Sequence, residues 1–123
     1  AGFSDADKTY FPVHDEYPQV NVAVQESDPA SYLNQMRFLL RVRQSQPALR
    51  RGEMAWVETG NTAVLAYRRF LPDKSEGLLC LFNLSDQPQT FTLQRERQDL
   101  LARDGNVLSG ELLLRPYAAH WFL

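Results

Sequence analysis

Two histidines are the residues of this chain with the clearest potential for acid–base chemistry. His14 precedes Asp15 and Glu16, and a histidine beside carboxylates can transfer a proton near neutral pH. Successive side chains of an extended segment diverge, so these three cannot converge on one substrate atom. We therefore interpret them as polar surface residues of a proline-flanked loop. His120 lies in the last apolar segment and is interpreted as a hydrogen-bonded structural residue.

Other kinds of catalytic or metal-binding pattern are missing from the sequence. The two histidines and the single Cys80 are far apart, which does not fit the spacing of a zinc site. There is no glycine-rich phosphate loop and no Gly-x-Ser-x-Gly elbow. We expect no catalytic residue, no metal site and no cofactor in this chain. Cys80 reads as a small buried hydrophobe in a reducing compartment, which favours a cytoplasmic location.

Aromatic residues provide one further candidate for ligand binding. A flat aromatic ring packs well on the apolar face of a pyranose, and Trp56 and Tyr67 are possible sugar-stacking residues. Both lie at alternating positions of expected strands, where core packing is the more economical interpretation. The sequence therefore favours a packing role and leaves the sugar platform open.

The N-terminal part of the chain is expected to contain one helix. Residues 1–27 show no sustained period and are interpreted as an irregular, extended segment. A helix is predicted at about residues 28–46, with Asp28 as N-cap, Pro29 in the first turn and Pro47 beyond its end. Its apolar residues occupy more than one side, which is typical of a helix packed between other elements.

From Gly52 onward the hydrophobic period changes to two, which predicts strands. A hairpin is expected over residues 53–70 with Gly60-Asn61 near its turn. Residues 78–84 contain too few polar residues to face water and predict a central strand buried on both faces. The remaining strands are expected near 90–93, Leu100, Val107, 112–114 and the C-terminus, with Ser109-Gly110 as a separating turn. This pattern predicts a mainly β, antiparallel sandwich or barrel.

Length and charge exclude several functions. With 123 residues, the chain is too short for a (β/α)8 barrel, which needs about 250 residues. Its 13 basic and 15 acidic side chains give a net charge of −2, whereas nucleic-acid-binding domains usually carry a basic excess. No apolar run is long enough to cross a bilayer. We therefore expect neither a nucleic-acid partner nor a membrane partner.

The first 52 positions contain several short motifs in a fixed order. They are the start Ala-Gly-Phe-Ser, Val20-Asn21-Val22, Asp28-Pro29-x-Ser31, and Pro47-Ala48-Leu49 with Gly52. In this order the motifs resemble the end of the catalytic barrel in α-amylase family enzymes, glycoside hydrolase family 13. The likeness is greatest to the α-glucosidase and trehalose synthase branch. Similarity to the family's C-terminal β-domain continues at residues 64–68, 79–85 and 116–117.

The resemblance implies a division of the chain and a structural role. Residues 1–52 would be the end of the barrel, including its last helix, and residues 53–123 the C-terminal β-sandwich. The catalytic carboxylates of this family precede the Ala-Gly-Phe segment, so the chain alone should be inactive. An α-glucan or α-glucoside substrate would bind the missing barrel, with Gly2, Phe3 and Ser4 in the loop nearest to it. The resemblance does not distinguish hydrolase, glucosyltransferase and isomerase.

The helix predicted at about residues 28–46 suggests that the isolated chain associates with a second copy of itself. A face formed by Tyr32, Leu33, Met36 and Leu40 would be left without the barrel, so self-association through it is expected. Two other functions remain open from the sequence. One is a free-standing carbohydrate-binding sandwich, and the other is a protein-interaction module that docks through the helix.

Overall fold

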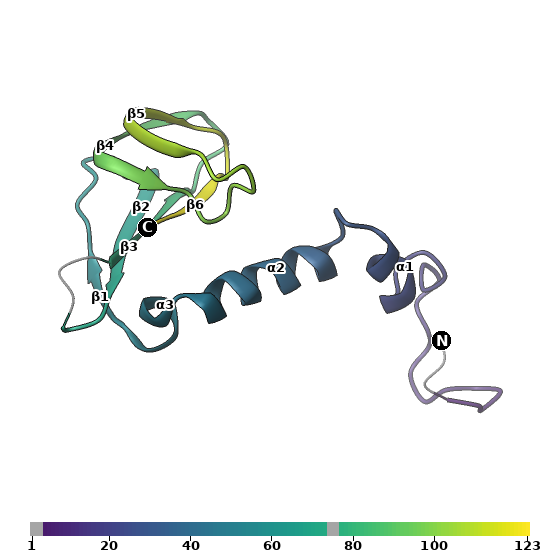
Figure 1. Cartoon of the computed structure of the whole chain (residues 1–123). Coiled ribbons are helices and arrows are strands. Elements are labelled where there is room, and N and C mark those ends of the chain that lie inside the picture. The colour runs from purple at the N-terminus through teal and green to yellow at the C-terminus, as the bar shows by residue number, and fades with distance from the viewer. Residues whose placement is uncertain (1–3, 74–76) are drawn as a thin grey trace. The chain divides into compact units, whose positions relative to one another are not determined.

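The computed structural model describes residues 4–73 and 77–123 and consists of two compact units, Ala1–Leu40 and Arg41–Leu123 (Figure 1). The predicted mainly β, antiparallel class is confirmed. The described elements, in chain order, are helices α1 (Val22–Ser27), α2 (Tyr32–Ser45) and α3 (Pro47–Arg51), then strands β1 (Glu53–Trp56), β2 (Val64–Phe70), β3 (Gly77–Asn83), β4 (Gln89–Gln98), β5 (Val107–Leu114) and β6 (Ala119–Phe122).

Helix α1 lies inside the segment that the sequence pattern assigned as irregular, so that assignment is wrong for these six residues. Asn21 caps the helix, because its side chain accepts a hydrogen bond from the backbone N–H of Val24 at 3.0 Å. None of the residues of α1 is buried. A six-residue helix without a buried face leaves no apolar period in the sequence, and only its cap marks it.

Helix α2 begins at Tyr32, four residues after the expected start. Asp28 instead closes a turn, with its carboxylate accepting the N–H of Ala30 at 2.8 Å. Ser31 takes the capping position, and its hydroxyl accepts the N–H of Asn34 at 3.3 Å. Two capping residues compete within four positions, and the second one starts the helix. The helix ends at Ser45, and Pro47 opens α3 rather than a loop.

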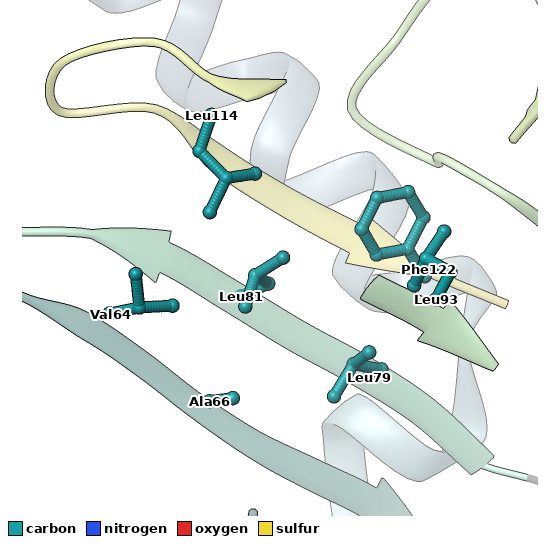
Figure 2. Packing of buried hydrophobic residues seen from close by; sticks show 7 residues of the cluster. All are labelled: Val64, Ala66, Leu79, Leu81, Leu93, Leu114 and Phe122. Carbon is teal, nitrogen blue, oxygen red and sulfur yellow. The ribbon is translucent and has the colours of Figure 1, made fainter. Parts of the chain in front are cut away.

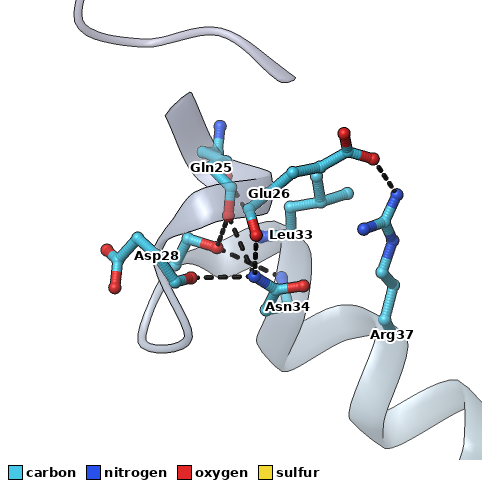
Figure 3. A network of polar contacts seen from close by, with 7 residues as sticks. Gln25, Glu26, Asp28, Leu33, Asn34 and Arg37 are labelled. Atoms are coloured by element: carbon cyan, nitrogen blue, oxygen red, sulfur yellow. Dashed lines mark hydrogen bonds and ion pairs between the residues drawn. The ribbon is translucent and has the colours of Figure 1, made fainter. Parts of the chain in front are cut away.

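Polar contacts organise the unit formed by residues 1–40 (Figure 3). The amide of Asn34 donates to the carbonyls of Gln25 at 2.9 Å and Asp28 at 2.8 Å. The Ser31 hydroxyl donates to the same Gln25 carbonyl at 2.6 Å. Arg37 and Glu26 form an ion pair at 2.7 Å. Ser31 is the only buried residue among the described positions 4–40, so this unit has no hydrophobic core of its own.

The second unit contains two antiparallel sheets with a shared core (Figure 2). Four strands are ordered β1-β2-β3-β6, and β4 pairs with β5. Strand β3 is central in its sheet and buried almost throughout, which confirms the prediction for this apolar run. Alternate residues of the larger sheet face β4 and β5. This core consists of Val64, Ala66, Leu79, Leu81, Leu93, Leu114 and Phe122.

The opposite face of the larger sheet, called the outer face below, carries α3. Ala48 and Leu49 of α3 pack with Leu78 and Cys80 of β3. Gly52 ends α3 where a Cβ atom would lie 2.4 Å from the Ala48 carbonyl oxygen, so the chain can turn into β1 only with glycine here. Arg69 of β2 donates to the Gly52 carbonyl at 2.8 Å and so ties α3 to the sheet.

Two details of the strand assignment differ from the sequence expectation. Ser109-Gly110 is not a turn, because β5 runs through it. Gly110 has a φ of 73°, and the pairing of β4 with β5 shifts between Leu93 and Arg97, so the glycine permits an irregularity within the ladder. Leu100 is not in a strand. Its neighbour Asp99 forms only a single bridge, with Phe122.

A buried amide joins β3 to the segments beside it. Asn83 is 2% exposed, and its side-chain nitrogen donates to the carbonyls of Gln87 at 2.7 Å, Arg115 at 3.0 Å and Leu114 at 3.3 Å. Its side-chain oxygen accepts the N–H and hydroxyl of Ser85. Because every polar atom of this side chain is paired, the amide is tolerated in the interior and fixes the turn after β3.

Candidate functional site

The expected substrate-proximal loop lies mostly outside the described residues. Gly2 and Phe3 are not described, and Ser4 is exposed, with its hydroxyl accepting the N–H of Ala6 at 3.2 Å. The structure therefore leaves the role of this loop as a prediction.

The first histidine candidate is on the surface, as interpreted from the sequence. His14 and Glu16 have side chains about three-quarters exposed, and His14 Nδ1 accepts the backbone N–H of Glu16 at 3.2 Å. These contacts form part of a local turn. They bring no third functional group to the histidine among the described residues.

The second histidine is half-buried and belongs to a pair with a buried carboxylate that the sequence did not reveal. His120 Nδ1 lies 2.7 Å from a carboxylate oxygen of Asp99, and the other oxygen accepts the N–H groups of Leu101 and Trp121. Burial alone would raise the pKa of Asp99, but these hydrogen bonds hold that pKa below its ordinary value. Asp99 therefore stays ionised although the residue is only 3% exposed. The hydrogen-bonded role expected for His120 is confirmed.

The Asp99–His120 pair connects two segments of the fold and does not form a catalytic triad. The ring of Phe122 stacks on His120 at 5.4 Å with planes 5° apart. Within the described part of the chain, no hydroxyl or thiol is hydrogen-bonded to His120. A nucleophile activated by the imidazole is therefore missing from residues 4–73 and 77–123. The arrangement anchors β6 to the segment that follows β4. No sequence pattern linked Asp99 to a histidine 21 positions away.

The aromatic candidates lie in one row across the outer face. Trp56 is paired with Tyr67, Tyr67 with Cys80, and Cys80 with Trp121, so the row crosses all four strands. The Trp56 and Tyr67 rings are perpendicular with centroids 6.0 Å apart, and Tyr67 stacks on Phe82 at 5.8 Å. Both aromatic–aromatic geometries are favourable. The structure thus brings the two candidate residues into contact with each other.

The middle of this row and its Trp56 end differ in burial. Cys80 is fully buried, and burial raises the pKa of its thiol and of the neighbouring Tyr67 hydroxyl. Neither group is therefore activated as a nucleophile. Trp56 by contrast is 64% exposed. Tyr67 and Cys80, in the middle of the row, pack the fold, and Trp56 at the β1 end of the row remains accessible.

A pocket of about 500 Å³ opens beside Trp56, where β1 ends and the hairpin loop begins. Its volume lies within the range of small-molecule sites, roughly 300–1,000 Å³. Trp56 lines it, whereas Tyr67 does not. The lining residues are Trp56, Val57, Glu58, Thr59, Gly60, Asn61, Thr62, Val64, Leu65, Ala66 and Leu84. Sequence reasoning had identified Trp56 but not the polar residues of the loop.

The described residues show neither a metal centre nor a membrane-spanning element. Among residues 4–73 and 77–123, no three histidine, cysteine, aspartate or glutamate side chains gather as a metal site would require. Over the same ranges, each helix is too short or too polar to cross a bilayer.

The fold and the sequence of the second unit define the class of protein. Residues 53–121 match the family described as a domain of unknown function, DUF3459. The chain belongs to this family, the C-terminal domain of α-amylase family enzymes. The resemblance to glycoside hydrolase family 13 is thus confirmed.

Individual relatives include an alpha-glucosidase and a trehalose synthase. The chain is 36% identical over 121 residues to a probable alpha-glucosidase of Rhizobium meliloti, covering 96% of this chain and 21% of that protein. It is also 36% identical over 104 residues to the trehalose synthase/amylase TreS of Mycobacterium tuberculosis, covering 79% of this chain and 17% of that protein.

Solved structures agree with these sequence matches. The trehalulose synthase MutB from Pseudomonas mesoacidophila MX-45 superposes with a TM-score of 0.74 at 26% identity, over 94% of this chain and 22% of that one. The chain therefore spans about a fifth of the length of the proteins it matches. It corresponds to the C-terminal part of α-glucosidase and trehalose synthase-type enzymes.

Proposed function

We propose that this chain is the C-terminal part of an enzyme that acts on α-glucosidic bonds and that its role there is structural. The observation that carries the proposal is the match over 96% of the chain to one fifth of an alpha-glucosidase. The catalytic carboxylates would lie in the remaining four fifths. The chain itself supplies the end of the barrel, as residues 1–52 with the last barrel helix at about residues 28–46, and a C-terminal β-sandwich, as residues 53–123.

The exposed side of α2 supports a structural role. Tyr32 is 86%, Met36 55% and Leu40 47% exposed, and none of the residues of α2 is buried. The sequence predicted a helix packed on more than one side, whereas the chain alone leaves this apolar side uncovered. A covering catalytic barrel accounts for the difference, because burying such side chains removes apolar surface from water. The same surface favours self-association of the isolated chain.

The substrate class and compartment are part of the same proposal. An α-glucan or α-glucoside would bind the barrel, with Gly2, Phe3 and Ser4 near it. A reducing, cytoplasmic compartment is supported by the one free cysteine, Cys80, which is buried. Hydrolysis, glucosyl transfer and isomerisation are all compatible with a C-terminal domain, since barrel loops determine the reaction.

The first test compares activity of the chain and of the longer polypeptide encoded by the continuous reading frame. We expect the longer polypeptide to cleave or rearrange maltose and the 123-residue chain to show no turnover. Turnover by the chain alone, or no turnover of any α-glucoside by the longer polypeptide, would contradict the proposal.

The second test uses a matched pair of substitutions on α2. Leu40→Asn replaces an exposed apolar residue, and Gln44→Asn introduces the same residue one helical turn later at an exposed polar position. In the longer polypeptide we expect Leu40→Asn to cost about 1–3 kcal/mol of stability, in line with exposing one buried apolar side chain. Gln44→Asn should stay within about 0.5 kcal/mol.

The same pair has a different expected effect in the isolated chain. Leu40→Asn should reduce self-association, measured by sedimentation velocity, and leave the unfolding of the second unit unchanged. Equal melting temperatures of both variants in the longer polypeptide would show that the barrel does not cover this face of α2.

A further inference from the structure

The pocket beside Trp56 combines an aromatic surface with polar groups that the fold leaves available. Trp56 and Tyr67 are perpendicular, so one ring presents its edge to the other and at least one broad face of the indole is not covered by Tyr67. Leu65 and Leu84 add apolar surface to the same pocket, and Leu84 is 58% exposed. A ligand with one flat apolar face would remove this surface from water.

The hairpin loop holds its backbone in place with some side chains and leaves others unengaged. Thr59 Oγ1 donates to the backbone carbonyls of Asn61 in the loop and Val64 in β2. Asn61 accepts the N–H of Ala63 at 2.9 Å and donates to Gln89 at 2.8 Å. Glu58 and Thr62 are exposed and form no hydrogen bond with described residues. The loop is therefore a preorganised frame with one carboxylate and one hydroxyl available for a ligand.

This mixture favours a hydroxyl-rich ligand over a protein partner. A protein covering Trp56 would also cover the Glu58 carboxylate, and burial of an unpaired charge is costly. Interface cores are accordingly depleted in charged residues. A pyranose instead presents C–H groups on one face to the indole and hydroxyl groups at its rim to a carboxylate and a threonine.

We propose that Trp56, Glu58 and Thr62 form a carbohydrate-binding subsite for α-glucosyl units in the pocket where β1 ends and the hairpin loop begins. Trp56 stacks on the sugar ring, and Glu58 accepts hydrogen bonds from its hydroxyl groups. Tyr67 does not line the pocket, and its ring packs at right angles to the indole and supports it. The choice of α-glucosyl units rests on the proposed function, and the site itself rests on the pocket.

The experiment is a titration of the 123-residue chain with maltotriose, followed by the two indole N–H signals in ¹H–¹⁵N NMR spectra. Trp121 serves as an internal reference, because its Nε1 is buried away from this pocket. We expect a saturable shift of the Trp56 signal and a constant Trp121 signal. No shift of Trp56, or equal shifts of both signals, would overturn the proposal.

Variants test the roles of individual residues, with affinity measured from backbone amide shifts of the hairpin loop. Trp56→Ala should weaken binding about tenfold, whereas Trp56→Tyr should retain most of it. Glu58→Gln keeps an acceptor without the charge and should weaken binding about threefold. Tyr10→Ala is the matched control, since Tyr10 is 95% exposed in the other unit and should bind like wild type. Equal affinity of Trp56→Ala and wild type would also overturn the proposal.

Failure of the sugar subsite can be distinguished from failure of the proposed function. If the longer polypeptide turns over maltose but the Trp56 signal does not respond, the subsite is wrong and the proposed function stands. If maltotriose binds at Trp56 but the longer polypeptide has no activity on α-glucosides, the subsite stands and the proposed function fails.

Discussion

The two units of this chain are stabilised by different kinds of interaction. Residues 41–123 bury two apolar clusters, one on each face of the larger sheet. Residues 4–40 bury only Ser31 and depend on hydrogen bonds around Asn34. Apolar burial is the main favourable contribution to folding, whereas a hydrogen bond contributes only about 1 kcal/mol net. The difference indicates that the second unit carries its own stability, whereas the described residues of the first unit gain little from apolar burial.

The largest expected difference in stability comes from replacing one phenylalanine by alanine in each unit. Phe122 is fully buried and Phe11 is 76% exposed. Phe122→Ala leaves a cavity in the shared core and should cost about 3–5 kcal/mol, while Phe11→Ala should stay within about 0.5 kcal/mol. Urea denaturation of the chain measures both. Similar costs for the two variants would mean that the units do not differ as described.

A smaller effect, with a defined pH dependence, is expected at Asp99. Its pKa is lowered in the folded state, so its stabilising contribution is present above the ordinary pKa of about 3.9 and is lost as pH falls through the folded pKa. Asp99→Asn should cost about 2 kcal/mol at pH 7, the value of hydrogen bonds to a charged group. The difference from wild type should shrink toward pH 2.

The control for this prediction is a carboxylate without such a site. Asp15 is exposed in the first unit, and Asp15→Asn should change the free energy of unfolding by less than about 0.5 kcal/mol at either pH. A constant Asp99→Asn penalty from pH 7 to pH 2 would rule out ionisation of Asp99 as the source.

The smallest effect on stability is expected from the hydrogen bonds of Asn34 in the first unit. Asn34→Ala removes donors to Gln25 and Asp28 but gains about 0.5 kcal/mol of helix propensity, so the net cost should be about 1 kcal/mol or less. Hydrogen exchange of the Ser31 and Leu33 amides should quicken. Exchange in β3 should not change, and a change there would show that the two units unfold together.

Asn83 in the second unit is the matched comparison for Asn34. It also donates to several carbonyls but is 2% exposed, so Asn83→Ala leaves buried acceptors unpaired and should cost about 1–3 kcal/mol. If Asn34→Ala proves more destabilising than Asn83→Ala, burial does not determine how much each asparagine contributes to stability.

The sequence was informative where a pattern was long or strongly apolar. The central strand β3 and the hairpin of β1 and β2 were predictable, because an unbroken apolar run and alternation around Gly60-Asn61 each permit few alternatives. Helix α1 was missed, since six exposed residues have no period to detect. The start of α2 was misplaced, because Asp28 and Ser31 are both good caps. Only the hydrogen bonds that the Ser31 hydroxyl and the Asn34 amide donate to the Gln25 carbonyl, six and nine residues away, select the second.

The candidate site was only partly predictable for a similar reason. Trp56 and Tyr67 stood out by residue type, but the sequence could not tell which of them is exposed. That depends on β1 being an edge strand and on α3 covering only part of the outer face. Asp99 was invisible, because its partner is 21 residues away and its significance arises only from burial. Glu58 and Thr62 became candidates only once the pocket was seen.

Asn83 has a consequence for producing this protein in a secretory host. Asn83-Leu84-Ser85 is an N-glycosylation acceptor sequence. In the folded chain the side-chain nitrogen that would carry the glycan is hydrogen-bonded to three carbonyls and buried. Glycosylation and native folding therefore exclude each other at this residue. A glycan attached during translocation would trap the chain before β3 and β5 could assemble, whereas expression in the bacterial cytosol avoids this competition.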